Sequence, residues 1–173
     1  MKIPWYIHGN WKLDSTQLQT LEKDILRVGV AQPKEQVITT YHAKDKDLGC
    51  LDFLYNFYKE RVDEISKDQF FFHTSKIHFT FWIQVYNKLG YHPIHDHFDC
   101  GNDTVLSFVH FLKPVENCFE FTDERQSLVP PQQEGDLIVF PSYVTHRVKQ
   151  HNSNVNRIVV AGNIKIDQHI KLN

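Results

Sequence analysis

The feature of this sequence that most restricts its fold is a series of short segments, beginning near residue 69, that are dense in aromatic and β-branched residues. They span residues 77–86, 104–112, 118–121, 136–140, 144–150 and 157–166. Residues of these types favour strands. Turn signals separate the segments, among them Asn87-Lys88-Leu89-Gly90, Lys113-Pro114 and Glu134-Gly135. Short strands with regular turns predict an antiparallel barrel or double sheet.

The first third of the chain has a helical pattern instead. Leu18, Leu21, Ile25 and Val28 recur at steps of three and four residues, which predicts one apolar face of a helix. Asp14 and Gln17 have the spacing of a capping box, and Gly29 is a natural stop. A second apolar stripe runs from residue 51 to residue 65. We expect a single domain over residues 1–173, in which residues 1–68 form a helical support for a β core over residues 69–173.

Composition excludes several classes of protein. A net charge of −2 does not favour the basic face that nucleic-acid binding usually needs. The chain has no apolar stretch near the ~20 residues of a membrane span, and its N-terminus lacks the apolar run of a signal peptide. The three cysteines form no C-x-x-C pair, which argues against a disulfide scaffold. We therefore expect a cytoplasmic globular protein whose partners are neither membranes nor nucleic acids.

Three residues with metal-binding side chains have the spacing of a known type of iron site. His97 and Asp99 lie two positions apart, so both side chains point to the same face of an extended segment. His146 would face them from a strand that is distant in sequence. Two histidines and one carboxylate fill one face of Fe(II) and leave the other face open for oxygen and an organic acid. The pattern predicts a non-haem iron site at His97, Asp99 and His146.

Because of His95, the sequence does not determine which residue is the third ligand. It is in phase with His97 and Asp99, so the set His95, His97 and His146 meets the same geometric requirement. A carboxylate would offset one of the two charges of the iron, which favours Asp99. A closed zinc site usually takes four Cys or His ligands, and the cysteines of this chain are wrongly spaced for it. Other histidines are interpreted as structural, among them His92, His110 and His151.

Four segments around these residues resemble the Fe(II)/2-oxoglutarate-dependent oxygenases. The resemblance is to small enzymes of the prolyl-hydroxylase type and to their short homologues from phages and marine bacteria. The segments are residues 85–91 with His95-Asp96-His97, residues 106–112, residues 135–142 leading to His146, and residues 157–160 with Asn163. The distance from Tyr86 to His95 is similar to that in the phage-like members, whereas H-x-D is the pattern of the prolyl hydroxylases. The resemblance implies an α+β fold with a mainly β core, a double-stranded β-helix (a jelly-roll or cupin-like barrel) supported by N-terminal helices.

The same resemblance implies a function and further site residues. Arg157 would bind the distal carboxylate of 2-oxoglutarate, since a guanidinium holds a carboxylate through two hydrogen bonds and stays charged when buried. Tyr86 would add a hydrogen bond to this co-substrate. We expect a dioxygenase that uses Fe(II), 2-oxoglutarate and O2 to hydroxylate a substrate such as a prolyl or other protein side chain, with release of succinate and CO2. Trp5, Trp11 and Tyr41 are candidates for the pocket rim.

Two other functions fit the same residues. One is a cupin-like iron dioxygenase with three histidines and without 2-oxoglutarate, in which Arg157 would have no role. The other is a barrel-shaped binding module without catalysis that recognises a peptide, a sugar or a nucleotide. A metal analysis and a titration with 2-oxoglutarate would separate the three.

Overall fold

The structure is a computed structural model that describes residues 6–43, 49–70, 77–98, 104–123 and 125–166. Within these ranges, two helices and eleven strands follow one another. They are β1 (Ile7–Asn10), α1 (Ser15–Val28), β2 (Val30–Gln32), β3 (Val37–Thr39), α2 (Gly49–Phe70), β4 (Ile77–Tyr86), β5 (His92–His95), β6 (Thr104–Lys113), β7 (Phe119–Thr122), β8 (Ser127–Leu128), β9 (Asp136–Pro141), β10 (His146–Val148) and β11 (Arg157–Ile166).

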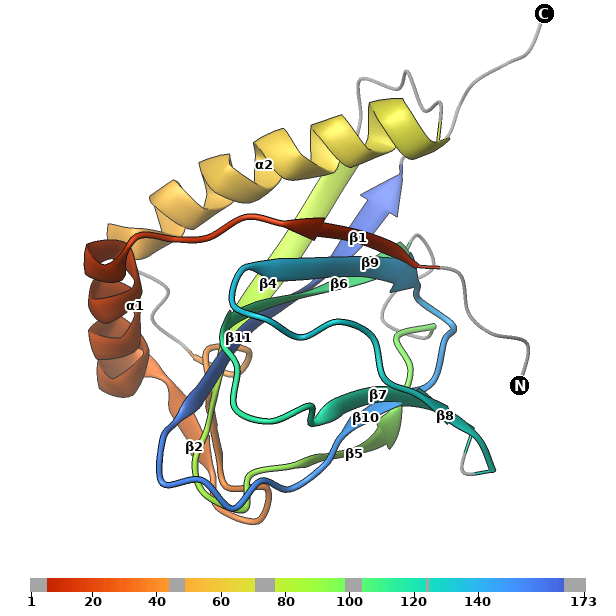
Figure 1. The fold of residues 1–173 in the computed structure, drawn as a ribbon. Coiled ribbons are helices and arrows are strands. Elements are labelled where there is room, and N and C mark those ends of the chain that lie inside the picture. The colour runs from red at the N-terminus through yellow and green to blue at the C-terminus, as the bar shows by residue number, and fades with distance from the viewer. Residues whose placement is uncertain (1–5, 44–48, 71–76, 99–103, 124, 167–173) are drawn as a thin grey trace, which may run out of the picture.

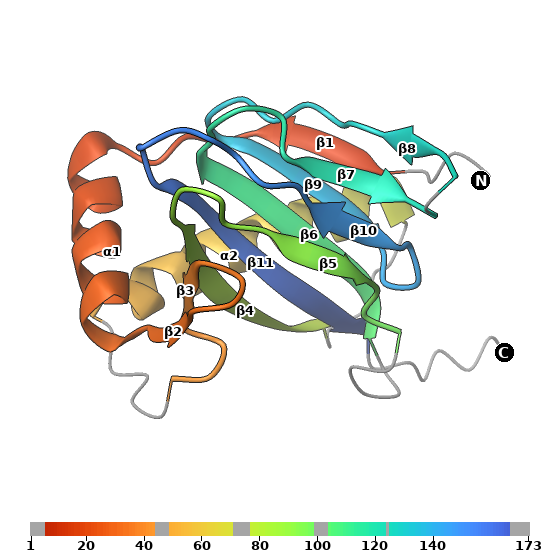
Figure 2. The same cartoon turned by 90° about the horizontal axis from the view of Figure 1, so that it is seen from below.

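The strands form two sheets that lie face to face (Figures 1 and 2). The larger sheet has the order β1-β9-β6-β11-β4-β3-β2, and the smaller one has the order β5-β10-β7-β8. All the strand pairs in the described part of the chain are antiparallel. Both helices lie on the outer side of the larger sheet (Figure 1). This confirms the expected double-stranded β-helix with helical support.

Two apolar cores hold the layers together. The first lies between the helices and the larger sheet, where Leu21 and Ile25 of α1 and Leu54 and Tyr58 of α2 pack against strand residues such as Ile83. The second lies between the two sheets and is rich in aromatic side chains, including Phe111, Phe119, Phe121 and Phe140. Burying a side chain of this size contributes roughly 1.5–3 kcal/mol. Aromatic rings are also large and rigid, so the second core lines the space between the two sheets with rigid walls.

The sequence patterns located most elements closely. β4 and β11 occupy the predicted segments, and α1 begins with the predicted capping box, in which Asp14 accepts from the backbone N–H of Gln17 and Gln17 accepts from that of Asp14. Gly29 ends α1 as expected, although with extended backbone. The first third contains the two expected helices, but the helical expectation missed three strands. This region also contributes β1, β2 and β3 to the larger sheet, and these strands are three or four residues long.

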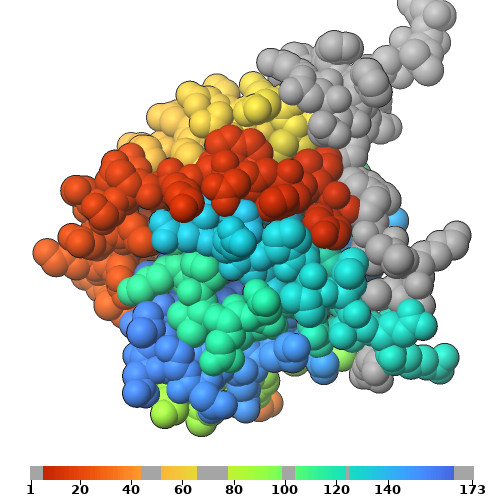
Figure 3. Space-filling model, in the orientation of Figure 1, coloured from red at the N-terminus to blue at the C-terminus, as the bar shows by residue number. Residues whose placement is uncertain are grey.

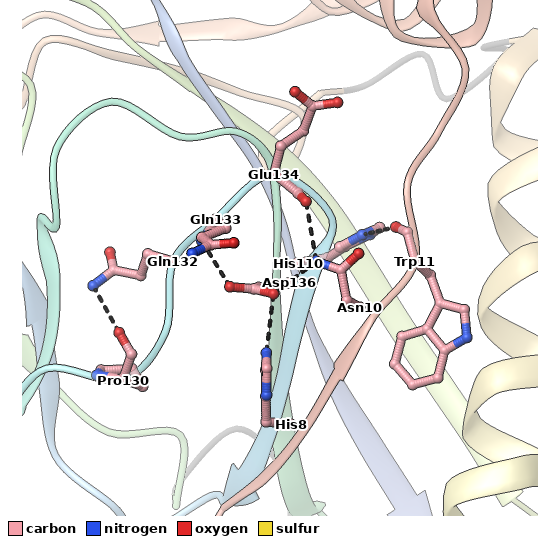
Figure 4. Close-up of polar contacts among 9 residues, drawn as sticks. All are labelled: His8, Asn10, Trp11, His110, Pro130, Gln132, Gln133, Glu134 and Asp136. Carbon is pink, nitrogen blue, oxygen red and sulfur yellow. Dashed lines mark hydrogen bonds and ion pairs between the residues drawn. The ribbon is translucent and has the colours of Figure 1, made fainter.

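A buried carboxylate fastens β1 to β9 (Figure 4). Asp136, which is 3% exposed, accepts hydrogen bonds from the Asn10 amide at 2.7 Å and from the Gln133 backbone N–H at 2.7 Å, and its Oδ1 lies 3.0 Å from Nε2 of His8. The preceding Gly135 has φ +86°, a conformation that glycine adopts readily, so the predicted turn before β9 forms there. As a result β1 lies on the surface between α2 and β9 (Figure 3).

The helices give no sign of a membrane span. In the described part of the chain, neither α1 nor α2 is long and apolar enough to cross a lipid bilayer.

Candidate active site

A cavity of about 390 Å³ lies between the two sheets. Strands β2, β3, β4, β6, β9 and β11 of the larger sheet and β5, β7 and β10 of the smaller one contribute lining residues. Successive side chains of a strand point to opposite faces, so Trp82, Gln84 and Tyr86 all face this space from β4. The lining also contains five histidines and one arginine: His42, His92, His95, His97, His146 and Arg157. The sequence had indicated His95, His97, His146 and Arg157 as site residues.

Three of these histidines meet at one place. Each of His95, His97 and His146 offers a ring nitrogen, and these atoms all lie within 4.8 Å of one another. His95 and His146 are paired residues of the neighbouring strands β5 and β10, which brings their ring centroids to 4.2 Å. The backbone N–H of His97 donates to Ser142 O at 2.8 Å, and this bond holds the end of β5 against the loop that leads to His146. The cluster therefore depends on contacts between segments about 50 residues apart.

The hydrogen bonds of two of the histidines determine which ring nitrogen is free. Nδ1 of His95 lies 2.9 Å from Pro93 O, and Nδ1 of His146 lies 2.9 Å from Val144 O. A carbonyl oxygen only accepts, so each Nδ1 carries the proton and each Nε2 presents a lone pair. A histidine that binds a metal usually donates a hydrogen bond of this kind from the ring nitrogen that does not bind the metal, and this bond fixes the orientation of the ring.

The surroundings keep these rings neutral. Burial lowers the pKa of His95, brings the pKa of His97 to about 4 and holds that of His146 well below its usual range. Neighbouring histidines lower the pKa of His97 and His146 further, because two positive rings would repel each other. A neutral imidazole is the form that binds metal ions, so the cluster is in its binding form at neutral pH.

The structure brings some predicted site residues together and leaves one untested. Asp99, the predicted carboxylate ligand, lies outside the described residues. His92, interpreted as structural, lines the cavity, and its ring centroid lies 4.5 Å from that of His95. His110 is structural as expected, since it bonds Tyr58 and Trp11 O in the outer core.

Arg157 lies in the same cavity with unusual surroundings. Its side chain is 0% exposed, yet Nε, Nη1 and Nη2 have no hydrogen-bond partner among the described residues. The guanidinium carbon lies 4.9 Å from the ring centre of Tyr86 and 5.6 Å from that of Phe111. A buried polar group without a partner costs about 1–3 kcal/mol, and more when it is charged. The arrangement therefore fits a guanidinium held ready for an anion that enters the cavity.

The rim of the cavity contains residues that the sequence patterns had only partly indicated. Tyr41 lines it as suggested, in edge contact with Trp82, and Trp82 lies 5.8 Å from the ring of His97. Trp11 packs in the outer core instead, and Trp5 lies outside the described residues. Trp82 stands two positions before Gln84 on β4, so the alternation of that strand could have indicated it once Tyr86 was assigned to the site.

Comparison with known proteins gives the family of the part of the chain that contains these residues. A family model described as "Putative 2OG-Fe(II) oxygenase" matches residues 80–163, the part of the chain that carries His95, His97, His146 and Arg157. This chain is a 2OG-Fe(II) oxygenase. Fe(II) and 2-oxoglutarate are accordingly its cofactor and co-substrate, so neither a cupin-like enzyme without 2-oxoglutarate nor a non-catalytic module describes it. A comparison with curated proteins finds no match.

Solved structures support the fold of this oxygenase. A prolyl-4-hydroxylase from Pseudomonas putida aligns with TM-score 0.66 and 14% identity over 96% of this chain and 95% of that chain. HygX from Streptomyces hygroscopicus, solved with nickel, 2-oxoglutarate and hygromycin B, aligns with TM-score 0.66 and 10% identity over 95% and 84%. A prolyl hydroxylase from Trichoplax adhaerens, solved with a hypoxia inducible factor peptide, has TM-score 0.66 and 10% identity over 94% and 84%. At these identities the likeness establishes the double-stranded β-helix and no more.

Proposed function

We propose that this oxygenase hydroxylates a C–H bond of its substrate with release of succinate and CO2, that His95, His97 and His146 bind its iron, and that Arg157 binds the distal carboxylate of 2-oxoglutarate. The observation that carries the proposal is the buried guanidinium of Arg157, which has no hydrogen-bond partner within the described ranges and lies in the same cavity as three converging histidines. A dicarboxylic acid that chelates a metal through one end needs a cation for its other end.

The histidine cluster fits Fe(II). Three nitrogen ligands on one side of the ion leave positions free for the co-substrate and oxygen. His95 and His146 support the three-histidine set best, because both present an unprotonated Nε2 and donate through Nδ1 to a carbonyl two residues earlier. Asp99 stays a prediction as the alternative third ligand.

Arg157 fits a carboxylate. Its planar guanidinium can donate two parallel hydrogen bonds, and burial makes these stronger than they would be in water. Tyr86 supports it from one side, with its ring against the guanidinium and its hydroxyl donating to Gln84 Oε1 at 3.0 Å. We propose Tyr86 as the residue that positions Arg157 and completes the co-substrate site.

These contacts indicate what the cofactor and the protein would each contribute to the reaction. When bound, iron and 2-oxoglutarate supply the oxidising chemistry, which side chains alone lack. Phe119 and Phe140 pack against the ring of His146, with centroids at 5.3 and 5.1 Å, and exclude water from that side of the cluster. The strand pair β5–β10 sets the direction of the ligand nitrogens, and Arg157 sets the direction of the co-substrate. A dry, rigid site keeps the oxidising chemistry directed at the substrate.

The direct test is release of succinate from 2-oxoglutarate by iron-loaded protein, measured by mass spectrometry under air and under nitrogen. Oxygen-dependent succinate formation is the expected result. Absence of succinate from protein that demonstrably binds both iron and 2-oxoglutarate would rule the proposal out.

Two broader expectations belong to the same proposal. We infer one oxygenase domain over residues 1–173, supported by the pairing of β1, β2 and β3 into the same sheet as β4, β6, β9 and β11. A cytoplasmic location is supported by the buried free thiol of Cys118, which bonds Val115 O rather than another cysteine.

A further inference from the structure

The three most exposed large hydrophobic side chains in the described part of the chain all belong to segments that carry the active site. Phe98 is 66% exposed, Tyr143 is 60% exposed and Tyr41 is 55% exposed. Phe98 follows His97 directly, Tyr143 precedes His146 by three residues, and Tyr41 lines the cavity. Large aromatic side chains usually contribute to stability by being buried, so a set of them left in solvent around one site indicates a contact surface.

Ring contacts and one backbone hydrogen bond place these residues around the metal end of the cavity. Tyr41 lies in edge contact with Trp82 at 5.1 Å, and Trp82 lies 5.8 Å from the ring of His97. The backbone bond from His97 N–H to Ser142 O brings together the chain neighbours Phe98 and Tyr143. We call Tyr41, Phe98 and Tyr143 the aromatic rim.

The rim extends beyond the cavity. Tyr41 is among the lining residues, whereas Phe98 and Tyr143 are not. The cavity volume of about 390 Å³ is near the lower end of the ~300–1,000 Å³ range of ligand pockets, and it also has to hold 2-oxoglutarate. The remaining space suits the reacting group of a substrate, while the rest of that substrate would lie across the rim.

Among the described residues that line the cavity, the charges at its mouth have one sign. Apart from the buried Arg157, the charged lining residues are the acids Glu35 and Asp96. Both lie beside β5: Glu35 O accepts from the backbone N–H of Tyr91, just before the strand, and Asp96 follows its last residue. Carboxylates next to exposed aromatic rings attract a cationic side chain and repel phosphate.

We propose that the substrate is a polypeptide segment that carries a lysine or arginine near the residue to be hydroxylated, and that the aromatic rim is its docking surface. This inference rests on the proposed function for its reaction, but the docking surface can be tested without turnover. A polypeptide combines apolar and cationic side chains over the length that the rim requires. A small metabolite would leave Phe98 and Tyr143 without a role, and a nucleic acid would place phosphates beside Glu35 and Asp96.

The test uses fluorescently labelled pools of random peptides with one fixed position, measured by anisotropy against the full chain with Zn(II) and 2-oxoglutarate. One pool fixes Lys or Arg, one fixes Glu, and a labelled single-stranded oligonucleotide is the third probe. We expect the basic pool to bind most tightly. Phe98→Ser and Tyr143→Ser should each weaken that binding about tenfold, as truncation of aromatic contact residues does.

Further variants distinguish a loss of docking from a loss of folding, and an effect of charge from an effect of shape. Leu26→Ser removes a side chain of similar exposure, 50%, from α1 and should leave peptide binding unchanged. Glu35→Gln keeps the shape of the mouth and should reduce the preference for the basic pool over the acidic one. Unchanged thermal unfolding midpoints for Phe98→Ser and Tyr143→Ser show that both variants are folded.

The outcomes distinguish the two proposals. If neither pool binds, if the oligonucleotide binds more tightly, or if both rim variants bind like the unmodified chain, the docking surface is overturned. If the basic pool binds through the rim but adding Fe(II) gives no hydroxylated peptide and no succinate, the docking surface stands and the proposed function fails.

Discussion

His95 and His146 face each other across the strand pair β5–β10, with ring centroids 4.2 Å apart and with each Nδ1 bonded to the carbonyl two residues earlier in its own segment. The two residues are therefore equivalent in their support as well as in their position. This equivalence makes His95 a candidate ligand of the same standing as His146, and it leads to the first prediction.

Replacement of His95 by Ala should weaken Fe(II) or Co(II) binding as strongly as His146→Ala does. Each change removes one of three proposed ligands, and we expect a loss of at least ~100-fold, beyond the 10–100-fold effect of losing a supporting hydrogen bond. Co(II) titration followed by visible absorption measures it. Asp99→Ala is the deciding comparison: a large loss in that variant, with His95→Ala near the unmodified affinity, would transfer the ligand role to Asp99.

His97→Asp should keep metal binding, whereas His97→Ala should lose it. The aspartate substitution creates an H-x-D pattern that begins at His95, in which a carboxylate takes the place of one imidazole and offsets one charge of the iron. The contrast between the two substitutions, measured by the same titration, shows whether position 97 acts as a ligand or as packing against Trp82. Equal binding by both variants would contradict the ligand role.

Arg157→Ala should weaken 2-oxoglutarate binding while leaving the metal affinity near its original value. Removing one partner of a buried charged pair costs about 2–5 kcal/mol, which corresponds to roughly 30-fold or more in affinity. Arg157→Lys should recover part of it, since lysine keeps the charge but not the two-bond geometry. The visible band of the iron–2-oxoglutarate chelate reports the binding. Arg125→Ala, at an exposed position, is the control.

Tyr58→Phe should destabilise the protein by about 1–2 kcal/mol without affecting the cavity. Nε2 of His110 lies 2.8 Å from Trp11 O and must donate to it, so Nδ1 accepts the Tyr58 hydroxyl at 2.9 Å. The substitution leaves that buried acceptor unsatisfied. Urea unfolding measures the change. Tyr55→Phe, at a 48% exposed position of the same helix, should change the unfolding free energy little.

Asp136→Asn should lower the free energy of unfolding at neutral pH and remove part of the decrease of that free energy at acidic pH. Burial raises the pKa of Asp136, but hydrogen bonds from Asn10, His8 and Gln133 outweigh this and hold it below the usual range. A carboxyl with a lowered pKa in the folded state contributes stability above its unfolded value of about 4 and loses it as the pH falls through the folded pKa. Urea unfolding at pH 7 should show a loss of about 1–3 kcal/mol. The difference between the two proteins should shrink at pH 3, and a constant difference would contradict the explanation.

Local patterns were sufficient to predict the parts of this protein that are decided within one segment. The capping box of Asp14 and Gln17 marked the start of α1, and the dense aromatic and β-branched runs located β4, β6 and β11. Strands as short as β2 and β3 escaped prediction, because three residues carry too little pattern to distinguish a strand from a loop. Their conformation is set by pairing with β4, which is a contact made only in the folded chain.

The features of the candidate site also fall into those that the sequence could predict and those that only the tertiary structure could show. The sequence by itself predicted His97, His146 and Arg157 as site residues, since their residue types and order already restrict the chemistry. Only the tertiary structure brought His95 against His146 and Tyr41 against Trp82. Only the folded chain could show that Arg157 is buried without a hydrogen-bond partner in the part of the chain that the structure describes. The alternation of side chains along one strand determines which face of the sheet each side chain takes. The distance between side chains of different strands depends on the register of those strands, and the packing of the whole barrel decides that register.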